Sequence, residues 1–391
     1  FSMIIKEAKR LGSVEEYYFS KKLKQIAQLR SEGKNIINLG IGSPDLPPSK
    51  ATIEALYQTA KDEKSHGYQS YVGIPELRQG IANWYKRTYN VDLNFSNEIL
   101  PLIGSKEGIM HISMAFINEG DTVLVPNPGY PTYTSVSNLV GAKIQYYNLD
   151  ENKDWAIDIT HLKSLDLKSV KAIWINYPNM PTGAQADENT LKELIKLAKE
   201  NEFLIINDNP YSLILNDKPT SIFNLEGAKE VCLELNSLSK SHNMAGWRIG
   251  WVCGGSDYIN SILKVKSNMD SGMFLGLQKA AIEALKSGKE WHDEVNAIYR
   301  ERRVLVCEIF DLLKCTYNPK QVGLFVWAKV PDEVESVEKF VDNILYKADV
   351  FITPGFIFGT NGGRYVRASL CGTKESCAEA LERINKLSFN V

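Results

Sequence analysis

The chain has 391 residues, of which 44% are hydrophobic and 24% are charged, and its formal net charge at pH 7 is −2. This length predicts a large and a small domain, and the nearly neutral charge gives no electrostatic reason to expect nucleic acid or an anionic membrane as a partner. We find no long apolar run and no signal peptide, which argues against a membrane span. We also find no CxxC pair and no histidine cluster, which argues against a disulfide framework and a structural metal site. This cysteine usage favours a reducing, cytoplasmic setting.

The first 80 residues predict one helix, one exposed turn and one loop that enters a helix. Apolar residues at helical spacing among lysines predict an amphipathic helix over residues 14–32. The apolar run 36–39 is followed by Gly40, Gly42 and a proline, which predicts a turn with accessible backbone amides. Residues 68–78 are typical of a loop that enters a helix, with a proline in its first turn.

A second helix start follows the apolar run 99–103. Gly104, Ser105 and Lys106 open this helix, and the free amides of a helix start bind anions. The segment is therefore a candidate phosphate site, although Gly-Ser is also a common helix cap.

Strands and helices alternate between residues 120 and 255. Nearly continuous apolar strands separated by helical patterns such as residues 191–200 predict a largely parallel sheet covered on both faces. The predicted strands are 122–126, 143–147, 172–177, 203–208 and 231–235.

Helical patterns dominate beyond residue 255 and predict a smaller α+β domain that is joined to the first by a continuous helix. The predicted helices are 274–287, 289–313, 335–348 and 374–388, and the predicted strands lie near 324–328 and 364–370. We place the large domain at residues 50–285 and the small domain at residues 1–49 and 286–391.

Two of the predicted strand ends carry polar residues suited to a site. Strand 203–208 ends at Asp208, and a buried carboxylate there requires a cation or a donor, such as a protonated pyridine nitrogen. Strand 172–177 runs into the rigid turn Asn176-Tyr177-Pro178-Asn179-Met180-Pro181-Thr182-Gly183.

The segment after strand 231–235 combines a lysine with phosphate-binding side chains. Lys240 lies beside Ser237 and Ser239, and Arg248 follows eight positions later. The amine can form a Schiff base with an aldehyde, while the hydroxyls and the guanidinium can hold a phosphate. Pyridoxal phosphate is the common cofactor that carries both groups.

Taken in order from about Leu39 to Leu370, these motifs resemble the class I/II pyridoxal-phosphate-dependent aminotransferases, which are fold-type I enzymes of the aspartate aminotransferase superfamily. The resemblance implies an α/β fold in which a large domain has a mostly parallel central sheet between helices and a smaller domain is α+β. It implies pyridoxal 5′-phosphate as cofactor and transfer of an amino group from an α-amino acid to a 2-oxo acid through a Schiff base on Lys240.

The resemblance also implies roles around the cofactor. Lys240 becomes the general acid and base once substrate displaces its amine. Asp208 pairs with the pyridine nitrogen, Tyr211 donates to the phenolate oxygen and Tyr130 stacks on the ring. The phosphate is held by Ser237, Ser239, Arg248, the amides of Ser105 and Lys106, and Tyr68 from the other subunit, which implies a homodimer with a shared active site.

For the substrate, the resemblance implies that Arg367 grips the α-carboxylate as a bidentate donor and that the amide of Gly42 assists. The alternative for Arg367 is a solvated arginine on an edge strand. The loop 354–359 is expected to close on the substrate. Lys106 either binds an acidic group of the substrate or only caps its helix, and the sequence leaves both interpretations open.

The chain departs from the family pattern at Met180, where an asparagine usually donates to the phenolate oxygen. Losing that donor weakens stabilisation of the deprotonated Schiff base, so we expect its pKa to be higher than in relatives with asparagine.

Three alternatives remain at the sequence level. A lyase that performs β-elimination on the same fold, of the C–S lyase type, requires the same lysine, aspartate and phosphate site. A regulator that binds pyridoxal phosphate is less favoured, because the chain has no basic DNA-binding extension. A nucleotide-binding Rossmann protein is less favoured, because no Gly-x-Gly-x-x-Gly follows a strand.

Overall fold

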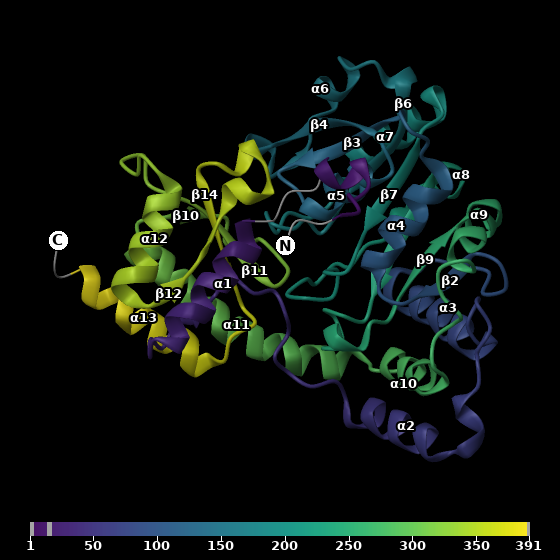
Figure 1. Cartoon of the computed structure of the whole chain (residues 1–391), viewed down its shortest axis with the longest axis horizontal. Coiled ribbons are helices and arrows are strands. Elements are labelled where there is room, and N and C mark those ends of the chain that lie inside the picture. Colours follow the sequence, from purple (N-terminus) through teal and green to yellow (C-terminus); the bar gives the residue numbers. More distant parts are fainter. Residues whose placement is uncertain (1–3, 14–17, 389–391) are drawn as a thin grey trace.

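The computed structural model describes residues 4–13 and 18–388 and contains two main sheets with their covering helices (Figure 1). The larger sheet has eight strands in the order β2-β9-β8-β7-β6-β3-β4-β5. These strands are β2 (Ile99–Leu102), β3 (Thr122–Asn127), β4 (Lys143–Asp150), β5 (Ala156–Ile157), β6 (Val170–Ile175), β7 (Leu204–Asp208), β8 (Cys232–Ser237) and β9 (Gly250–Gly254).

Parallel pairing dominates the middle of this sheet. Strands β8, β7, β6, β3 and β4 pair in parallel, whereas β9 runs antiparallel to β8 and β2, and β5 runs antiparallel to β4. Strands buried on both faces need continuous apolar sequences, and all five residues of β7 are buried. The predicted α/β fold with a mostly parallel central sheet is confirmed.

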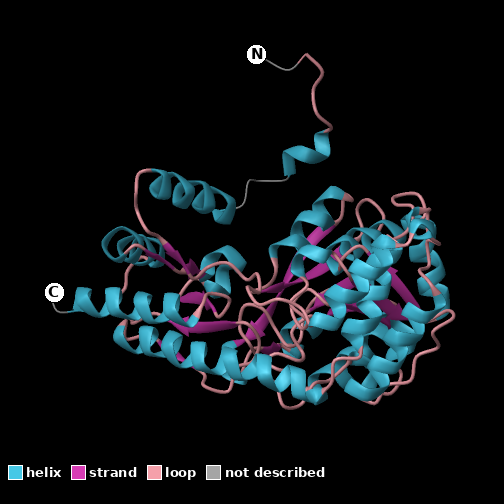
Figure 2. Ribbon diagram, turned by 90° about the horizontal axis from the view of Figure 1, so that it is seen from below, coloured by secondary structure: helices cyan, strands magenta, loops and turns pink. Residues whose placement is uncertain are grey.

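Helices lie on both faces of the strands (Figure 2). Along β6, Ile173 and Ile175 join the hydrophobic cluster on one face, and Trp174 joins the cluster on the other. The helices of this part are α2 (Lys50–Lys61), α3 (Pro75–Tyr89), α4 (Ser105–Phe116), α5 (Pro131–Leu139), α6 (Ile159–Lys163), α7 (Glu188–Asn201), α8 (Ala228–Val231), α9 (Ser256–Lys266) and α10 (Leu275–Leu285).

Helix α7 illustrates why these segments become helices. The Asp187 carboxylate accepts a hydrogen bond from the amide of Thr190 and caps the helix start. Leu191, Leu194 and Ala198 then recur at helical spacing and are buried against the sheet.

The smaller sheet has four antiparallel strands in the order β10-β11-β14-β13, which are β10 (Thr316–Tyr317), β11 (Phe325–Lys329), β14 (Tyr365–Ser369) and β13 (Thr353–Pro354). A short parallel pair lies beside it, β1 (Ile37–Asn38) and β12 (Val350–Phe351). The helices here are α1 (Tyr18–Ser31), α11 (Lys289–Leu312), α12 (Val337–Ala348) and α13 (Lys374–Ser388). Of the predicted helix 14–32, residues 14–17 lie outside the described residues.

Single 3₁₀ turns connect these elements. They are η1 (Lys9–Ser13), η2 (Glu63–His66), η3 (Glu151–Lys153), η4 (Leu167–Ser169), η5 (Ile222–Asn224), η6 (Ala245–Trp247), η7 (Gly355–Phe358) and η8 (Thr360–Gly362).

Helix α11 makes contacts in both parts of the molecule (Figure 1). The Asn296 side chain donates to the carbonyl of Leu213 and accepts from the amide of Leu215, near the large sheet. Further along the helix, Arg302 donates to the carbonyl of Leu370 at the end of β14. A continuous helix therefore links the two sheets, while the predicted domain boundaries stay a prediction.

Two further expectations concern cysteines and membranes. All six cysteines are free thiols, and five of them are buried. Within the described ranges, no helix combines the length and apolar character that a membrane crossing requires.

Candidate active site

Most of the predicted residues meet in a cavity of about 300 Å³ at the carboxyl end of the parallel strands. Strand β2 runs antiparallel to β9, and β9 runs antiparallel to β8, so β2 and β8 end at the same edge. Leu102, Gly250 and Ser237 are neighbours across these three strands. Ligands of α/β sheets bind at this kind of edge.

One end of the cavity is built for an anion. Helix α4 begins directly after Gly104, whose φ is +81°. The first amides of a helix have no partner within the helix, and Gly104 offers no side chain to cap them. The Arg248 guanidinium lies against this turn, because a Cβ on Gly104 would come within 2.3 Å of Arg248 Nη2. The buried residues Ser237 and Ser239 line the same wall. Amides, hydroxyls and a guanidinium together suit a phosphate.

Lys240 lines the cavity from the segment that follows β8. Its Nζ donates to the backbone carbonyl of Gly42. Burial lowers the pKa of the ammonium, and the positive charges of Arg367 and Arg248 act in the same direction. A lowered pKa increases the fraction of neutral, nucleophilic amine near pH 7.

Asp208 is buried at the end of β7, and only one of its two carboxylate oxygens accepts a hydrogen bond from the described residues. Tyr133 donates to Oδ2 at 2.8 Å, whereas Oδ1 has no hydrogen-bond partner within the described ranges. Burial raises the pKa of this carboxyl to about 6, although the Tyr133 hydrogen bond opposes the increase. The free Oδ1 can accept a hydrogen bond from a cationic N–H, which would stabilise the ionised carboxylate.

Tyr133 is a site residue that the sequence predictions missed. Its ring stacks on Trp174 with centroids 5.1 Å apart and an interplanar angle of 7°, and Tyr130 meets it edge-on at 5.5 Å. The ring is therefore fixed where it holds the Asp208 carboxylate. The available signal was spacing, because Tyr130 and Tyr133 are three residues apart where α5 begins.

Tyr211 also lines the cavity, and its ring meets Phe325 with centroids 6.1 Å apart. Burial raises the pKa of its hydroxyl, and the Arg367 guanidinium opposes this increase only in part. The hydroxyl is therefore protonated at neutral pH and can donate a hydrogen bond into the cavity.

Arg367 is buried and has no acidic partner among the described residues. Its guanidinium lies 3.9 Å from the Phe325 ring centroid and 4.8 Å from that of Phe358. Burial lowers its pKa to about 10, so it stays charged at neutral pH. The alternative of a solvated edge-strand arginine is wrong, because β14 lies between β11 and β13.

The polar contacts of Arg367 are a backbone carbonyl and a thioether. Nη2 donates to Gly40 O at 2.8 Å, and Nη1 lies 3.2 Å from the sulfur of Met180. Asn176 holds the turn that carries Met180, because its side chain accepts from the amide of Met180 and donates to the carbonyl of Asp208, each at 2.7 Å. A thioether is a weak acceptor, so a substrate carboxylate would be a far stronger partner for the guanidinium.

A larger cavity of about 850 Å³ adjoins the first and shares part of its wall. Lys106, Tyr130 and Arg367 line both cavities. The outer wall adds polar side chains from α5 and residues from α1 and the turn η7, including Tyr18, Thr134, Ser135, Asn138, Ile357 and Phe358. The predicted mobile loop 354–359 thus contributes to this wall, and its Phe358 also packs on Arg367.

Two residues near the motifs do not line either cavity. Tyr68 is 93% exposed in the single chain. His242, two residues after Lys240, is buried elsewhere, where its ring stacks on Trp291 with centroids 5.8 Å apart. The structure thus brings together Gly42, Ser105, Lys106, Tyr130, Asp208, Tyr211, Ser237, Ser239, Lys240, Arg248 and Arg367, and it leaves Tyr68 outside.

Pyridoxal 5′-phosphate fits the chemistry of this cavity. The anion-binding end suits its phosphate, Lys240 suits its aldehyde, and the unpaired Oδ1 of Asp208 suits its ring N–H. The role of each residue toward the cofactor remains a prediction.

Comparison with known proteins agrees with this geometry over nearly the whole chain. The family model "Aminotransferase class I and II" matches residues 34–384. An LL-diaminopimelate aminotransferase of Nitratidesulfovibrio vulgaris is 40% identical over 385 residues, which cover 98% of this chain and 99% of that protein. The enzyme of the same name from Aquifex aeolicus is 38% identical over 382 residues, with 97% and 98% covered.

A solved structure, substrate-bound BacF from Bacillus subtilis, is similar over 98% of both chains, with 34% identity and a TM-score of 0.93.

Proposed function

Because the chain belongs to the class I and II aminotransferases and is a pyridoxal 5′-phosphate-dependent aminotransferase, we propose that its reaction centres on Lys240, Asp208 and Arg367. We also propose that its amino donor is an α-amino acid with a second charged end. Its substrates are amino acids and 2-oxo acids. The residue assignment rests on one observation, that a single cavity holds a desolvated amine, a carboxylate with a free oxygen and a guanidinium without an acidic partner. Since the curated relatives are aminotransferases, the lyase alternative is disfavoured.

When bound, pyridoxal phosphate supplies an aldehyde that condenses with amines and a cationic ring that accepts electron density from the α-carbon. Lys240 provides the amine that holds it, and once free this amine can carry a proton between the α-carbon and the aldehyde carbon. Its lowered pKa favours the neutral form that both tasks require. Asp208 Oδ1 would accept a hydrogen bond from the ring nitrogen of the bound cofactor, while Tyr133 on Oδ2 keeps the carboxylate oriented.

Arg367 and the turn around Gly42 define the substrate side. The guanidinium is desolvated between two aromatic rings, so an α-carboxylate would form a bidentate ion pair that water competes with weakly. The Gly42 carbonyl accepts from Lys240, so the amine is held in the same cavity that Arg367 lines.

The adjoining cavity supports a donor that is longer than the common small amino acids. LL-Diaminopimelate, the substrate in the names of the similar relatives, carries a carboxylate and an ammonium at each end. With one carboxylate on Arg367, the other end would extend into the 850 Å³ cavity, where Lys106 can pair with the second carboxylate. Polar residues of α5, among them Thr134, offer partners for the distal ammonium.

A half-reaction tests the activity and the lysine together. The cofactor-loaded chain is mixed with each amino acid of a panel, without any 2-oxo acid. A transaminase loses its yellow absorbance and releases no ammonia, and Lys240→Ala should be inert. Continuous ammonia release would instead indicate the lyase and overturn the proposal.

Steady-state kinetics test the donor class. We expect LL-diaminopimelate to have the highest kcat/KM of the panel. Lys106→Met should lower that value about tenfold, because a charge-assisted bond is lost, while alanine turnover should change less than about threefold. Lys143→Met, at an exposed site on β4, should match wild type. An equal loss for both donors would contradict the assignment of Lys106.

A homodimer completes the proposed site. Tyr68 is nearly fully exposed, and large apolar side chains such as Tyr57, Tyr71 and Met269 are exposed on neighbouring segments. Exposed apolar side chains of this size are typical of contact surfaces. We place Tyr68 at the phosphate of the partner subunit.

A further inference from the structure

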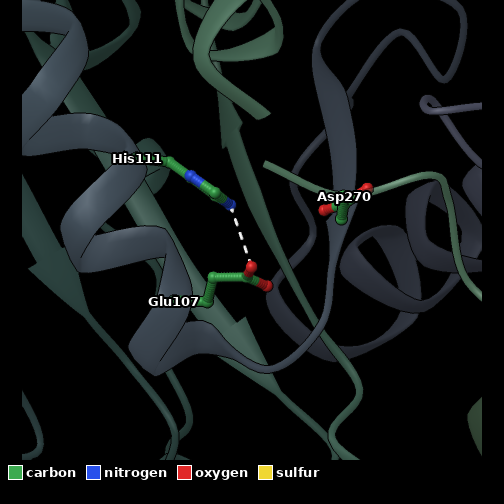
Figure 3. Close-up of side chains that lie close together, drawn as sticks. All are labelled: Glu107, His111 and Asp270. Atoms are coloured by element: carbon green, nitrogen blue, oxygen red, sulfur yellow. Dashed lines mark ion pairs between the residues drawn. The ribbon is translucent and has the colours of Figure 1, made fainter. Parts of the chain in front are cut away.

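A cluster of metal-binding side chains lies outside both cavities. Glu107 and His111 are one turn apart on the same side of α4, and Asp270 comes from the loop that follows α9 (Figure 3). One potential ligand atom from each residue lies within 4.8 Å of the other two. Figure 3 shows the His111 ring and both carboxylates directed toward one another.

The ligand atoms of this cluster are largely unused. The His111 ring is fully buried, and among the described residues neither nitrogen has a hydrogen-bond partner, although Nε2 lies 3.4 Å from Glu107 Oε1. Glu107 Oε2 and Asp270 Oδ2 are also buried without a hydrogen-bond partner in the described part of the chain. Each such buried polar atom costs on the order of 1–3 kcal/mol unless something binds it. A cation would satisfy several of them at once.

The loop holds Asp270 in a way that leaves one oxygen free. Lys266 Nζ and the Gly272 amide both donate to Oδ1, at 2.8 Å and 2.9 Å. The side chains of this Lys–Asp pair are 3% and 9% exposed. Two carboxylates and one ammonium leave the cluster net negative when the imidazole is neutral, so a divalent cation is electrostatically favoured there.

The distances suit a small ion. His111 Nε2 lies 3.4 Å from Glu107 Oε1. Ligands at about 2.0–2.2 Å in a tetrahedral zinc site are separated by roughly this distance. The ligand atoms of all three residues lie within 4.8 Å of one another, so small movements of the side chains would bring the three residues onto one ion. One imidazole and two carboxylates are ligands that Zn²⁺ accepts, and the Glu107 side chain is 30% exposed, which leaves room for a water as fourth ligand.

From these contacts we propose that Glu107, His111 and Asp270 form a binding site for a divalent transition ion, with Zn²⁺ as the best match. The ion would connect helix α4 to the loop that follows α9. Glu107 follows Lys106 at the start of α4, while Gly272 packs against the carbonyls of Gln69 and Ser70 beside Tyr68. Bound metal would therefore stabilise the packing of α4 against the loops that carry Asp270 and Tyr68.

Binding of Zn²⁺ to the cofactor-loaded protein tests the proposal. Free cofactor is removed first, because it chelates metals, and a phosphine keeps the thiols reduced. Isothermal titration should give one Zn²⁺ per chain, and Zn²⁺ should raise the melting temperature. The matched variants are His111→Gln and Glu107→Gln, with His66→Gln as a control that removes an exposed imidazole.

We expect the site variants to bind Zn²⁺ at least about tenfold more weakly and the control to match wild type. Anomalous scattering at the zinc edge should place the ion between the three side chains. No saturable binding by wild type, or equal binding by folded His111→Gln, would overturn the proposal. If His111→Gln fails to fold, Glu107→Gln decides the outcome, because its side chain is partly exposed.

Discussion

At the scale of single residues, the buried Asp208 carboxyl should make the stability of the cofactor-free chain depend on pH. Its folded-state pKa of about 6 lies above the ordinary value of 3.8, so ionisation is less favourable in the folded state. The contribution of the protonated Asp208 carboxyl to the free energy of unfolding is fully present below about pH 4 and is lost as the pH rises through 6. Asp208→Asn should therefore make the cofactor-free chain more stable at pH 8 by on the order of 3 kcal/mol, and by less than about 1 kcal/mol at pH 4.

Urea unfolding of the cofactor-free protein at several pH values measures this difference. The exposed Asp217→Asn serves as the control and should follow wild type throughout. A gain for Asp208→Asn that does not vary with pH would show that the cost arises from packing and not from ionisation.

Met180 offers a second test at this scale, because its sulfur occupies the contact with Arg367 that a polar side chain could make. Met180→Asn introduces a donor that can reach the phenolate oxygen of the bound cofactor. Such a donor stabilises the form that has lost the imine proton, so the pH midpoint of the yellow absorbance should fall. Met180→Leu keeps the volume without a donor and should retain the wild-type midpoint. Identical midpoints in the two variants would contradict the hypothesis that the missing donor at position 180 raises the pKa of the imine.

Single residues also mark where sequence reasoning stopped. Lys240, Asp208 and Arg367 could be named because each lies in a local motif with distinctive chemistry. Tyr133 was not named, because its position against Asp208 arises from a contact between segments that are 75 residues apart. The Glu107–His111–Asp270 cluster was missed for the same reason, since Asp270 is far from α4 in sequence.

At the scale of elements, α11 is fixed to the loop after β1 by an ion pair in which only the arginine is buried. Arg302 donates to both oxygens of Asp45, at 2.6 Å and 2.8 Å. The Arg302 side chain is only 4% exposed, whereas that of Asp45 is 28% exposed. The two single truncations should therefore not be equivalent.

Asp45→Ala should destabilise the chain by about 3 kcal/mol, because it leaves a buried guanidinium without a counter-ion, with the Leu370 carbonyl as its remaining acceptor. Arg302→Met should cost less, because water can reach Asp45 and methionine fills part of the volume. The double variant should be more stable than Asp45→Ala alone. Urea unfolding of all four proteins gives the coupling energy, and additive losses would contradict a direct pairing.

The elements themselves were largely predictable where burial is strong. The five predicted parallel strands correspond to β3, β4, β6, β7 and β8. Strands β3, β6, β7 and β8 are almost entirely buried, and strands covered on both faces have continuous apolar sequences. Strand β4 is mostly not buried and has a mixed sequence. Strand β9 was missed, since it is a short segment bounded by Gly250 and Gly254 that follows the lysine motif directly. Its antiparallel course matters, because it places α4 beside Ser237.

At the scale of the whole molecule, the proposed homodimer makes one subunit depend on the other. Tyr68 is 93% exposed in the isolated chain and lies outside its own cavity, while the anion-binding end of that cavity is formed by α4, Arg248 and the serines. If Tyr68 donates to the phosphate in the partner subunit, each site needs Lys240 from one chain and Tyr68 from the other. A site that spans two chains can be tested by complementation.

Tyr68→Ala and Lys240→Ala are first prepared as separate homodimers, which should have little activity at limiting cofactor. After the two are mixed, unfolded and refolded together, a hybrid dimer contains one site with both residues intact and one site with neither. Random pairing makes half of the dimers hybrids, so activity should recover to about a quarter of the wild-type value per chain. Tyr68 acting within its own subunit predicts no recovery, because every chain then lacks either its own tyrosine or its own lysine. An affinity tag on the Lys240→Ala chain, which should retain untagged Tyr68→Ala chain after refolding, shows that the hybrids have formed, so a lack of recovery would count directly against the shared site.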